Sequence, residues 1–339
     1  MGREAPGASS EGSDAAQTVP LAYVVPIRGE EPVAGEFASY LRQTSGRVAH
    51  LIVVDGSAAD VARANRRSLE GLHLIRPSRV TPNGKVGAVL TGLAACTQDA
   101  VVVADDDVRY RPSDLVEVAR RLRTADAVVP QNVFRPMPWH ARWDTARTLI
   151  HRAIGVDMPG TIALRRGALP AGYASDVLFE NLELLRTIAA SGGRIAIARD
   201  LFVARRPPSA PHFWSQRVRQ AYDEFARPGH MLAWLSILPA ILFASARRRR
   251  AYVLGVAIGS IAVAELGRRR DGSRTEFPPT SALWAPIWLA ERAICSWLAV
   301  VAALGGGVPY RGDRIRRAAT PLRVLRSRAA ASSARAEAA

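Results

Sequence analysis

The chain has 339 residues, with 46 basic and 30 acidic side chains, a formal net charge of +16 and two cysteines. So few cysteines exclude a disulfide framework, and we expect the soluble part to face a reducing cytoplasm. Most of the excess charge lies in residues 201–339, which hold 22 basic and 8 acidic side chains. Because these arginines are interleaved with apolar stretches, an anionic membrane surface is favoured over nucleic acid as the partner.

The N-terminal third of the chain predicts a leader followed by alternating strands and helices. Residues 1–19 are rich in Gly, Ala, Ser and acidic residues and lack the apolar core of a secretory signal, so we expect a disordered leader. We predict strands at residues 21–27, 51–54, 72–75 and 100–104, and helices at residues 33–43, 58–69 and 84–96. This alternation predicts an α/β fold whose mostly parallel sheet is covered on both faces and binds ligands beyond the carboxyl ends of its strands.

Three consecutive carboxylates, Asp105, Asp106 and Asp107, follow the last of these strands. They repel one another unless a divalent cation lies between them, and such a cation also holds the phosphates of a nucleotide. The alternative is a solvated, Asp-rich turn before a helix that has Pro112 at an early position. The first two strands also end in polar residues, namely Arg28, Glu30 and Asp55.

Lys85 is the only lysine among the 46 basic residues. A position that keeps a lysine in so arginine-rich a chain suggests a need for a compact ammonium group, although chance retention is the alternative. Lys85 follows Asn83-Gly84 at a predicted helix start, where it is well placed to meet a phosphate.

The apolar stretches of the C-terminal part are residues 231–246, 251–266 and 282–304. The first two are shorter than the roughly 20 residues of a spanning helix, so short spans, a re-entrant hairpin and interfacial helices all stay open. The third contains Glu291 and Arg292 at its middle, so either this pair faces protein or water, or the segment lies in the membrane interface. Arginine clusters at residues 247–250 and 268–270 flank the middle stretch on both sides and leave its orientation open.

The order of these motifs resembles the family 2 glycosyltransferases with the GT-A fold. The resemblance rests on residues 24–31, on residues 53–57, on Gly84-Lys85 and on the Asp triplet, which is similar to the family's Asp-x-Asp motif. It implies a nucleotide-sugar donor, a UDP- or GDP-sugar, and Mg²⁺ or Mn²⁺ as cofactor. The implied nucleotide-binding residues are Pro26, Arg28, Glu30, Asp55, Lys85, Asp105 and Asp106, and the implied metal ligands are Asp105 and Asp107.

The resemblance continues into an acceptor region at residues 159–166 and 179–184. The family's general base is an Asp where this chain has Asn181, and a neutral amide cannot accept that proton. The resemblance therefore leaves Glu180 or Asp176 as the catalytic base, or an acceptor that is already ionised, such as a lipid phosphate. A plain amphipathic helix is the alternative interpretation of this segment.

Residues 216–220 resemble the Gln-x-x-Arg-Trp motif of membrane-bound members such as cellulose and hyaluronan synthases and ceramide glucosyltransferase. Gln216 and Arg219 match, whereas Gln220 replaces the Trp. The resemblance implies that Arg219 meets the leaving diphosphate. Trp214 is either a substitute for the missing Trp or, like Tyr222, an anchor at the lipid surface. Residues 309–314 resemble the short segment after the last membrane helix, so the resemblance covers residues 21–317.

The function implied is an inverting, metal-dependent glycosyltransferase that moves a sugar to a membrane lipid or lipid-linked acceptor of the cell envelope, such as a glycolipid. A polysaccharide synthase, a nucleotidyltransferase and an inactive membrane scaffold are the alternatives. We expect a leader at residues 1–19, a catalytic domain at 20–228, membrane-associated helices at 229–310 and a basic cytoplasmic tail at 311–339. The expected location is the inner membrane, with the catalytic domain in the cytoplasm.

Overall fold

The computed structural model describes residues 18–310 and 313–337 of the chain. Residues 1–17 of the expected leader lie outside the described residues. The expected leader ends too late, because Val19 is buried and begins the first strand.

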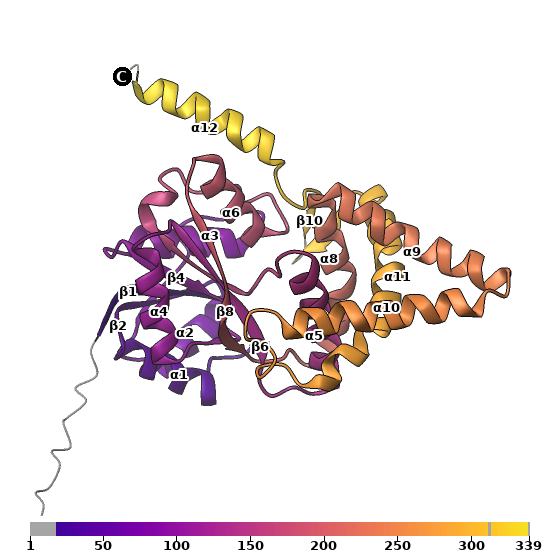
Figure 1. Ribbon diagram of the computed structural model, residues 1–339. Helices are drawn as coiled ribbons and strands as arrows, with labels where there is room; N and C mark the ends of the chain where they lie inside the picture. Colours follow the sequence, from indigo (N-terminus) through magenta and orange to yellow (C-terminus); the bar gives the residue numbers. More distant parts are fainter. Residues whose placement is uncertain (1–17, 311–312, 338–339) are drawn as a thin grey trace, which may run out of the picture.

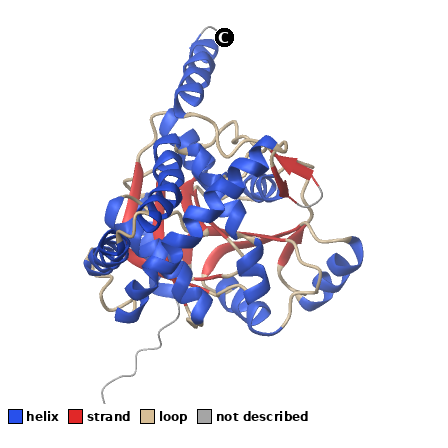
Figure 2. Cartoon of the chain, turned by 90° about the vertical axis from the view of Figure 1, so that its right-hand side faces the viewer, coloured by secondary structure: helices blue, strands red, loops and turns tan. Residues whose placement is uncertain are grey.

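An eight-stranded mixed sheet forms the centre of the expected catalytic domain, which we call the catalytic part (Figure 2). Its order is β3-β2-β1-β4-β7-β6-β8-β5. The first four strands are parallel to one another, β7 is antiparallel to both of its neighbours, and β6 and β8 are parallel. The strands are β1 (Val19–Ile27), β2 (Val48–Asp55), β3 (His73–Ile75), β4 (Ala100–Ala104), β5 (Val108–Arg109), β6 (Ala127–Phe134), β7 (Thr161–Arg165) and β8 (Ile195–Arg205).

Helices cover both faces of this sheet, as the sequence predicts. Leu41 of α1 and Val118 of α4 pack in the core on one face, and Val89 of α3 and Ile188 of α6 pack in the core on the other. The four predicted strands and three predicted helices are confirmed, with boundaries that shift by up to three residues. The helices are α1 (Gly35–Ser45), α2 (Ala59–Ser68), α3 (Gly84–Ala95), α4 (Pro112–Leu122), α5 (Trp139–Ile154), α6 (Glu180–Ala190), α7 (Ala210–Ser215) and α8 (Arg217–Tyr222).

Among the described residues, three helices that follow the catalytic part are long and apolar enough to cross a membrane: α9 (Pro228–Ala246), α10 (Arg250–Arg269) and the continuous stretch Pro279–Leu304, which ends in α11 (Ala285–Leu304). The first two are longer than their apolar runs, because each continues into its flanking residues. Figure 1 shows α9 and α10 as a hairpin that projects from the body. Only 17% of the apolar segment of α9 is buried, and the share for α10 is the same. For Pro279–Leu304 the buried share is 39%.

The charged pair in the middle of α11 faces protein, which is one of the environments that the sequence analysis left open. Glu291 lies 3.7 Å from Arg217 of α8 and accepts a hydrogen bond from the indole of Trp143 in α5. Arg292 donates to the backbone carbonyl of Gln220 in α8 at 2.8 Å. The middle of α11 therefore lies against the catalytic part, where these partners satisfy charges that lipid could not.

The expected boundary at residue 310 does not coincide with a structural boundary. Strand β10 (Asp313–Ile315) pairs with β9 (Val308–Tyr310), and the backbone nitrogen of Thr320 donates to the buried Glu183 of α6. Residues 313–320 thus pack on the catalytic part, and α12 (Leu322–Glu337) is the segment that projects from it (Figure 1).

Gly267 sets how closely α10 approaches α5. A Cβ at this position would collide with the carbonyl oxygen of Leu149 and would lie 3.1 Å from the backbone nitrogen of Ala153. We expect Gly267→Ala to destabilise the fold by roughly 1–3 kcal/mol, because backbone atoms of α5 cannot move aside as a side chain could. Gly259→Ala in the same helix meets nothing within 4 Å and is the matched control. Thermal melting in detergent is the measurement, and equal melting temperatures for the two variants would contradict this interpretation.

Candidate active site

A pocket of about 710 Å³ lies at the carboxyl ends of β1 and β4, at the sheet edge that the topology predicts for a ligand. We call it the central pocket. Its wall combines residues from the sheet, from α3, from the start of α6 and from α8. The sequence-predicted residues that line it are Pro26, Arg28, Lys85, Asp105, Asp106, Asp107, Glu180, Gln216 and Arg219.

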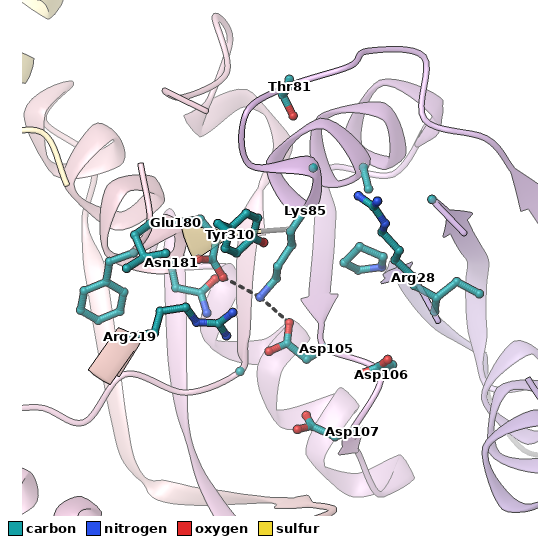
Figure 3. A pocket seen from close by; sticks show the side chains of 18 of the residues that line it. Arg28, Thr81, Lys85, Asp105, Asp106, Asp107, Glu180, Asn181, Arg219 and Tyr310 are labelled. Atoms are coloured by element: carbon teal, nitrogen blue, oxygen red, sulfur yellow. Dashed lines mark hydrogen bonds and ion pairs between the residues drawn. The ribbon is translucent and has the colours of Figure 1, made fainter. Parts of the chain in front are cut away.

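Lys85 lies between two carboxylates of the central pocket (Figure 3). Its Nζ forms an ion pair with Asp105 and donates to Oε1 of Glu180 at 2.7 Å. Burial would lower the pKa of Lys85, but the charges of Asp105 and Glu180 outweigh it and hold the pKa above its ordinary value. The backbone nitrogen of Lys85 donates to the side chain of Asn83, which caps α3. The helix start therefore fixes a charged ammonium group inside the pocket.

Arg205 is a second cation of the central pocket, and the sequence analysis missed it. Its Nε donates to Oδ2 of Asp107 at 2.8 Å, and its guanidinium lies 3.8 Å from Asp105. Arg205 is the last residue of β8 and lies almost a hundred residues after Asp107 in the chain. No sequence motif connects Arg205 with Asp107.

The Asp triplet retains excess negative charge despite these two cations. Burial is the main cause that raises the pKa of Asp106 to about 6, and the charges of Asp107 and Asp105 add to it. Burial also raises the pKa of Asp107, whose Oδ1 is buried without a hydrogen-bond partner among the described residues. These oxygens fit a divalent cation. Among the described residues no three His, Cys, Asp or Glu side chains converge on one point, so a cation would need further ligands from a diphosphate and water.

Gly160 brings the loop before β7 directly against the Asp triplet. Its carbonyl accepts the backbone nitrogen of Asp105 at 2.8 Å, and a Cβ at this position would lie 2.8 Å from the Asp105 carboxylate. A side chain here would push Asp105 away from Lys85. The sequence analysis assigned this segment to the acceptor region, and the structure shows that it also positions the triplet.

The predicted bases lie in different surroundings. Glu180 lines the central pocket but is paired with Lys85. Asp176 does not line the pocket and lies 3.2 Å from Arg317 at the surface. Asn181 lines the pocket, and its amide nitrogen donates to the carbonyl of Pro159 at 2.9 Å, which fixes the side chain in place.

The nucleotide loop is only partly at the pocket surface. Pro26 and Arg28 line it, whereas Glu30 and Asp55 do not. Asp55 is fully buried, and its two oxygens accept hydrogen bonds from the backbone of Ser57 and from the side chain of Asn65. These two hydrogen bonds hold the loop after β2. Two further arginines that the sequence analysis did not select, Arg76 and Arg79, line the same end of the pocket.

The segment resembling the Gln-x-x-Arg-Trp motif reaches the opposite end of the pocket. Arg219 stacks over the ring of Tyr310 at 5.6 Å, and Tyr310 donates to Asn83 at 3.0 Å. Trp214 does not line the pocket; it packs edge-on against Trp143 in an aromatic cluster with α5. Trp214 is therefore not placed to substitute for the missing Trp of the motif.

Several comparisons with known proteins bear on this geometry. Residues 23–170 match the family described as "Glycosyl transferase family 2". No curated protein matches the chain. A mannosyltransferase from Pyrobaculum calidifontis, in complex with GDP-Man and Mn²⁺, is 19% identical, with 94% of this chain and 81% of that chain covered and a TM-score of 0.45. Glucosyl-3-phosphoglycerate synthase from Mycobacterium tuberculosis, in complex with Mn²⁺, UDP and glucosyl-3-phosphoglycerate, is 22% identical, with 63% and 81% covered and a TM-score of 0.41.

The residues that match glycosyl transferase family 2 include Lys85, the Asp triplet and most of the strands whose carboxyl ends form the central pocket.

Proposed function

We propose that this protein is an inverting, metal-dependent glycosyltransferase that moves a sugar from a nucleoside diphosphate donor, a UDP- or GDP-sugar, to a lipid or lipid-linked acceptor at the membrane. The observation that carries the proposal is the convergence of Lys85 and Arg219 with the Asp triplet in the central pocket. The two cations match a diphosphate, and the carboxylates match a ribose and a divalent cation.

The donor binds with its nucleoside toward Arg28 and its diphosphate near Lys85. The acceptor oxygen attacks the anomeric carbon from the side opposite the diphosphate, which inverts the configuration. As the bond to the diphosphate breaks, the ammonium of Lys85 and the guanidinium of Arg219 stabilise the charge on the leaving oxygens. Bound Mg²⁺ or Mn²⁺ would be held by Asp105 and Asp107 and would neutralise part of the same charge.

The surroundings of α8, at one end of the pocket, support the proposal of a lipid acceptor. Helix α8 contributes Arg219 to the pocket wall. It contacts α11 through the side chain of Arg217 and the backbone carbonyl of Gln220. The α9–α10 hairpin beyond it is mostly exposed and apolar. Its large exposed side chains are Leu232, Leu242, Phe243, Tyr252, Leu254, Ile258 and Leu266. An acceptor held in the bilayer would therefore lie on the side of the protein where α8 contacts the membrane-candidate helix α11.

Transfer of label from a nucleotide-sugar to lipid tests the proposal. Purified full-length protein in detergent is incubated with Mn²⁺, membrane lipid extract and a panel of labelled UDP-, GDP- and dTDP-sugars. We expect label in the organic phase from one donor. Nucleotide release without labelled lipid would instead indicate a polysaccharide or protein acceptor. If no donor gives nucleotide release or sugar transfer, the result favours an inactive scaffold.

We also expect the α9–α10 hairpin to insert into the bilayer rather than to rest on it. A helix of 19 or 20 residues is about 28–30 Å long, close to the thickness of the hydrocarbon core. The protein should therefore stay in the membrane pellet after washes in 1 M salt and at alkaline pH. Release by salt alone would show that the arginines bind the surface electrostatically and that the hairpin is not inserted.

A further inference from the structure

Asp223 is a carboxylate of the central pocket that the sequence analysis did not select. It begins the short 3-10 helix Asp223–Ala226, directly after α8. Arg219 lies four residues earlier, so the two side chains share one helix face, and both line the pocket. Asp223 therefore reaches the same space as the predicted base, Glu180.

The other carboxylates of the pocket are already engaged. Asp105 and Glu180 share Lys85, and Asp107 is bound to Arg205. Asp106 belongs to the triplet that would hold a cation. Oδ1 of Asp223, like Oδ1 of Asp107, is buried and has no hydrogen-bond partner among the described residues, but Asp223 lies outside the triplet that would hold the cation.

We propose that Asp223 is the general base of the reaction proposed above, on which this inference rests. Its carboxylate takes the proton of an acceptor hydroxyl while the acceptor oxygen bonds to the anomeric carbon. The bond from that carbon to the diphosphate breaks, and the nucleoside diphosphate leaves with the electron pair. A base is needed only for a neutral hydroxyl, so the acceptor is an alcohol, such as a sugar hydroxyl of a glycolipid, rather than a lipid phosphate.

Four charged groups face Asp223: Glu180 from α6, Arg219 from α8, its neighbour Glu224, and Arg292 from α11. Burial raises the pKa of Asp223 to about 8, and the charge of Glu180 adds to this rise while Arg219 opposes it. A base acts in its deprotonated form. Turnover should therefore rise with pH, about tenfold per unit below pH 8, and level off above it.

The test compares Asp223→Asn with wild type in the lipid-transfer assay. We expect kcat to fall about 10²- to 10⁴-fold, with the affinity for nucleoside diphosphate and Mn²⁺ changed less than about twofold. The rise of turnover toward pH 8 should disappear in this variant. Asp200→Asn, the same change at a side chain that is 63% exposed, is the matched control.

Asp223→Asn turnover within about threefold of wild type, with an unchanged pH profile, would overturn the assignment. Loss of nucleotide affinity in parallel with kcat would also overturn it, because it would reveal a structural role. If the Asn variant does not fold, Asp223→Glu is used instead, because it keeps a carboxylate and its turnover should still rise with pH. A wild-type turnover that does not change with pH would contradict the proposal. Absence of transfer by wild type from every donor would overturn the proposed function as well, so the two failures are distinguishable.

Discussion

Replacing Asp107 with alanine is expected to lower sugar transfer by at least about 10³-fold. Asp107 supplies the buried Oδ1 that has no partner among the described residues, and its other oxygen holds Arg205 at 2.8 Å. Without this carboxylate, a divalent cation loses its ligand and Arg205 its orientation. The measurements are initial rates of lipid labelling and calorimetric binding of nucleoside diphosphate with and without Mn²⁺.

The metal dependence of nucleotide binding separates this explanation from general damage. In wild type, Mn²⁺ should strengthen nucleotide binding and a chelator should abolish transfer. In Asp107→Ala, the metal-free affinity should persist and the strengthening by Mn²⁺ should be lost. Asp107→Asn, which keeps the size of the side chain, should behave like the alanine variant. If Mn²⁺ strengthens binding equally in all three proteins, Asp107 is not a metal ligand.

Replacing Lys85 with methionine is expected to lower kcat by about 10²- to 10³-fold. The ammonium group that meets the leaving diphosphate is removed, and Asp105 and Glu180 are left facing one another without the cation between them. Steady-state kinetics and the affinity for nucleoside diphosphate are the measurements.

Lys85→Arg tests why this position is a lysine. It is the only lysine among the 46 basic residues of the chain. A compact ammonium fits between two carboxylates that a planar guanidinium would force apart, so we expect arginine not to restore turnover. Turnover of Lys85→Arg within about threefold of wild type would instead support chance retention of the lysine.

The parts of this protein that depend on short-range pattern could be predicted from the sequence. The four apolar runs that form β1 to β4, and the polar residues that follow β1 and β4, are local signals, and the sheet brings them to one edge. For Glu291 and Arg292 the sequence excluded only direct exposure to the lipid core, which would leave their charges unsatisfied, and the structure shows that they are buried in protein.

The parts that depend on contacts between distant segments could not be predicted in this way. Arg205 and Asp223 enter the pocket because β8 and the end of α8 fold back onto the Asp triplet and α6. Asp55 turns inward because Asn65, ten residues later, offers it a hydrogen bond. Asp176 lies outside the pocket because Arg317, from the far end of the chain, holds it there.

The most direct test of the central claim is the position of Mn²⁺ in a crystal of the full-length protein grown with a nucleoside diphosphate, located by its anomalous scattering. The proposal predicts a manganese ion bound to an oxygen of Asp107 and to the diphosphate, with Lys85 and Arg219 contacting the phosphate oxygens. A diphosphate bound outside the central pocket, or a manganese ion without a ligand from the Asp triplet, would contradict it.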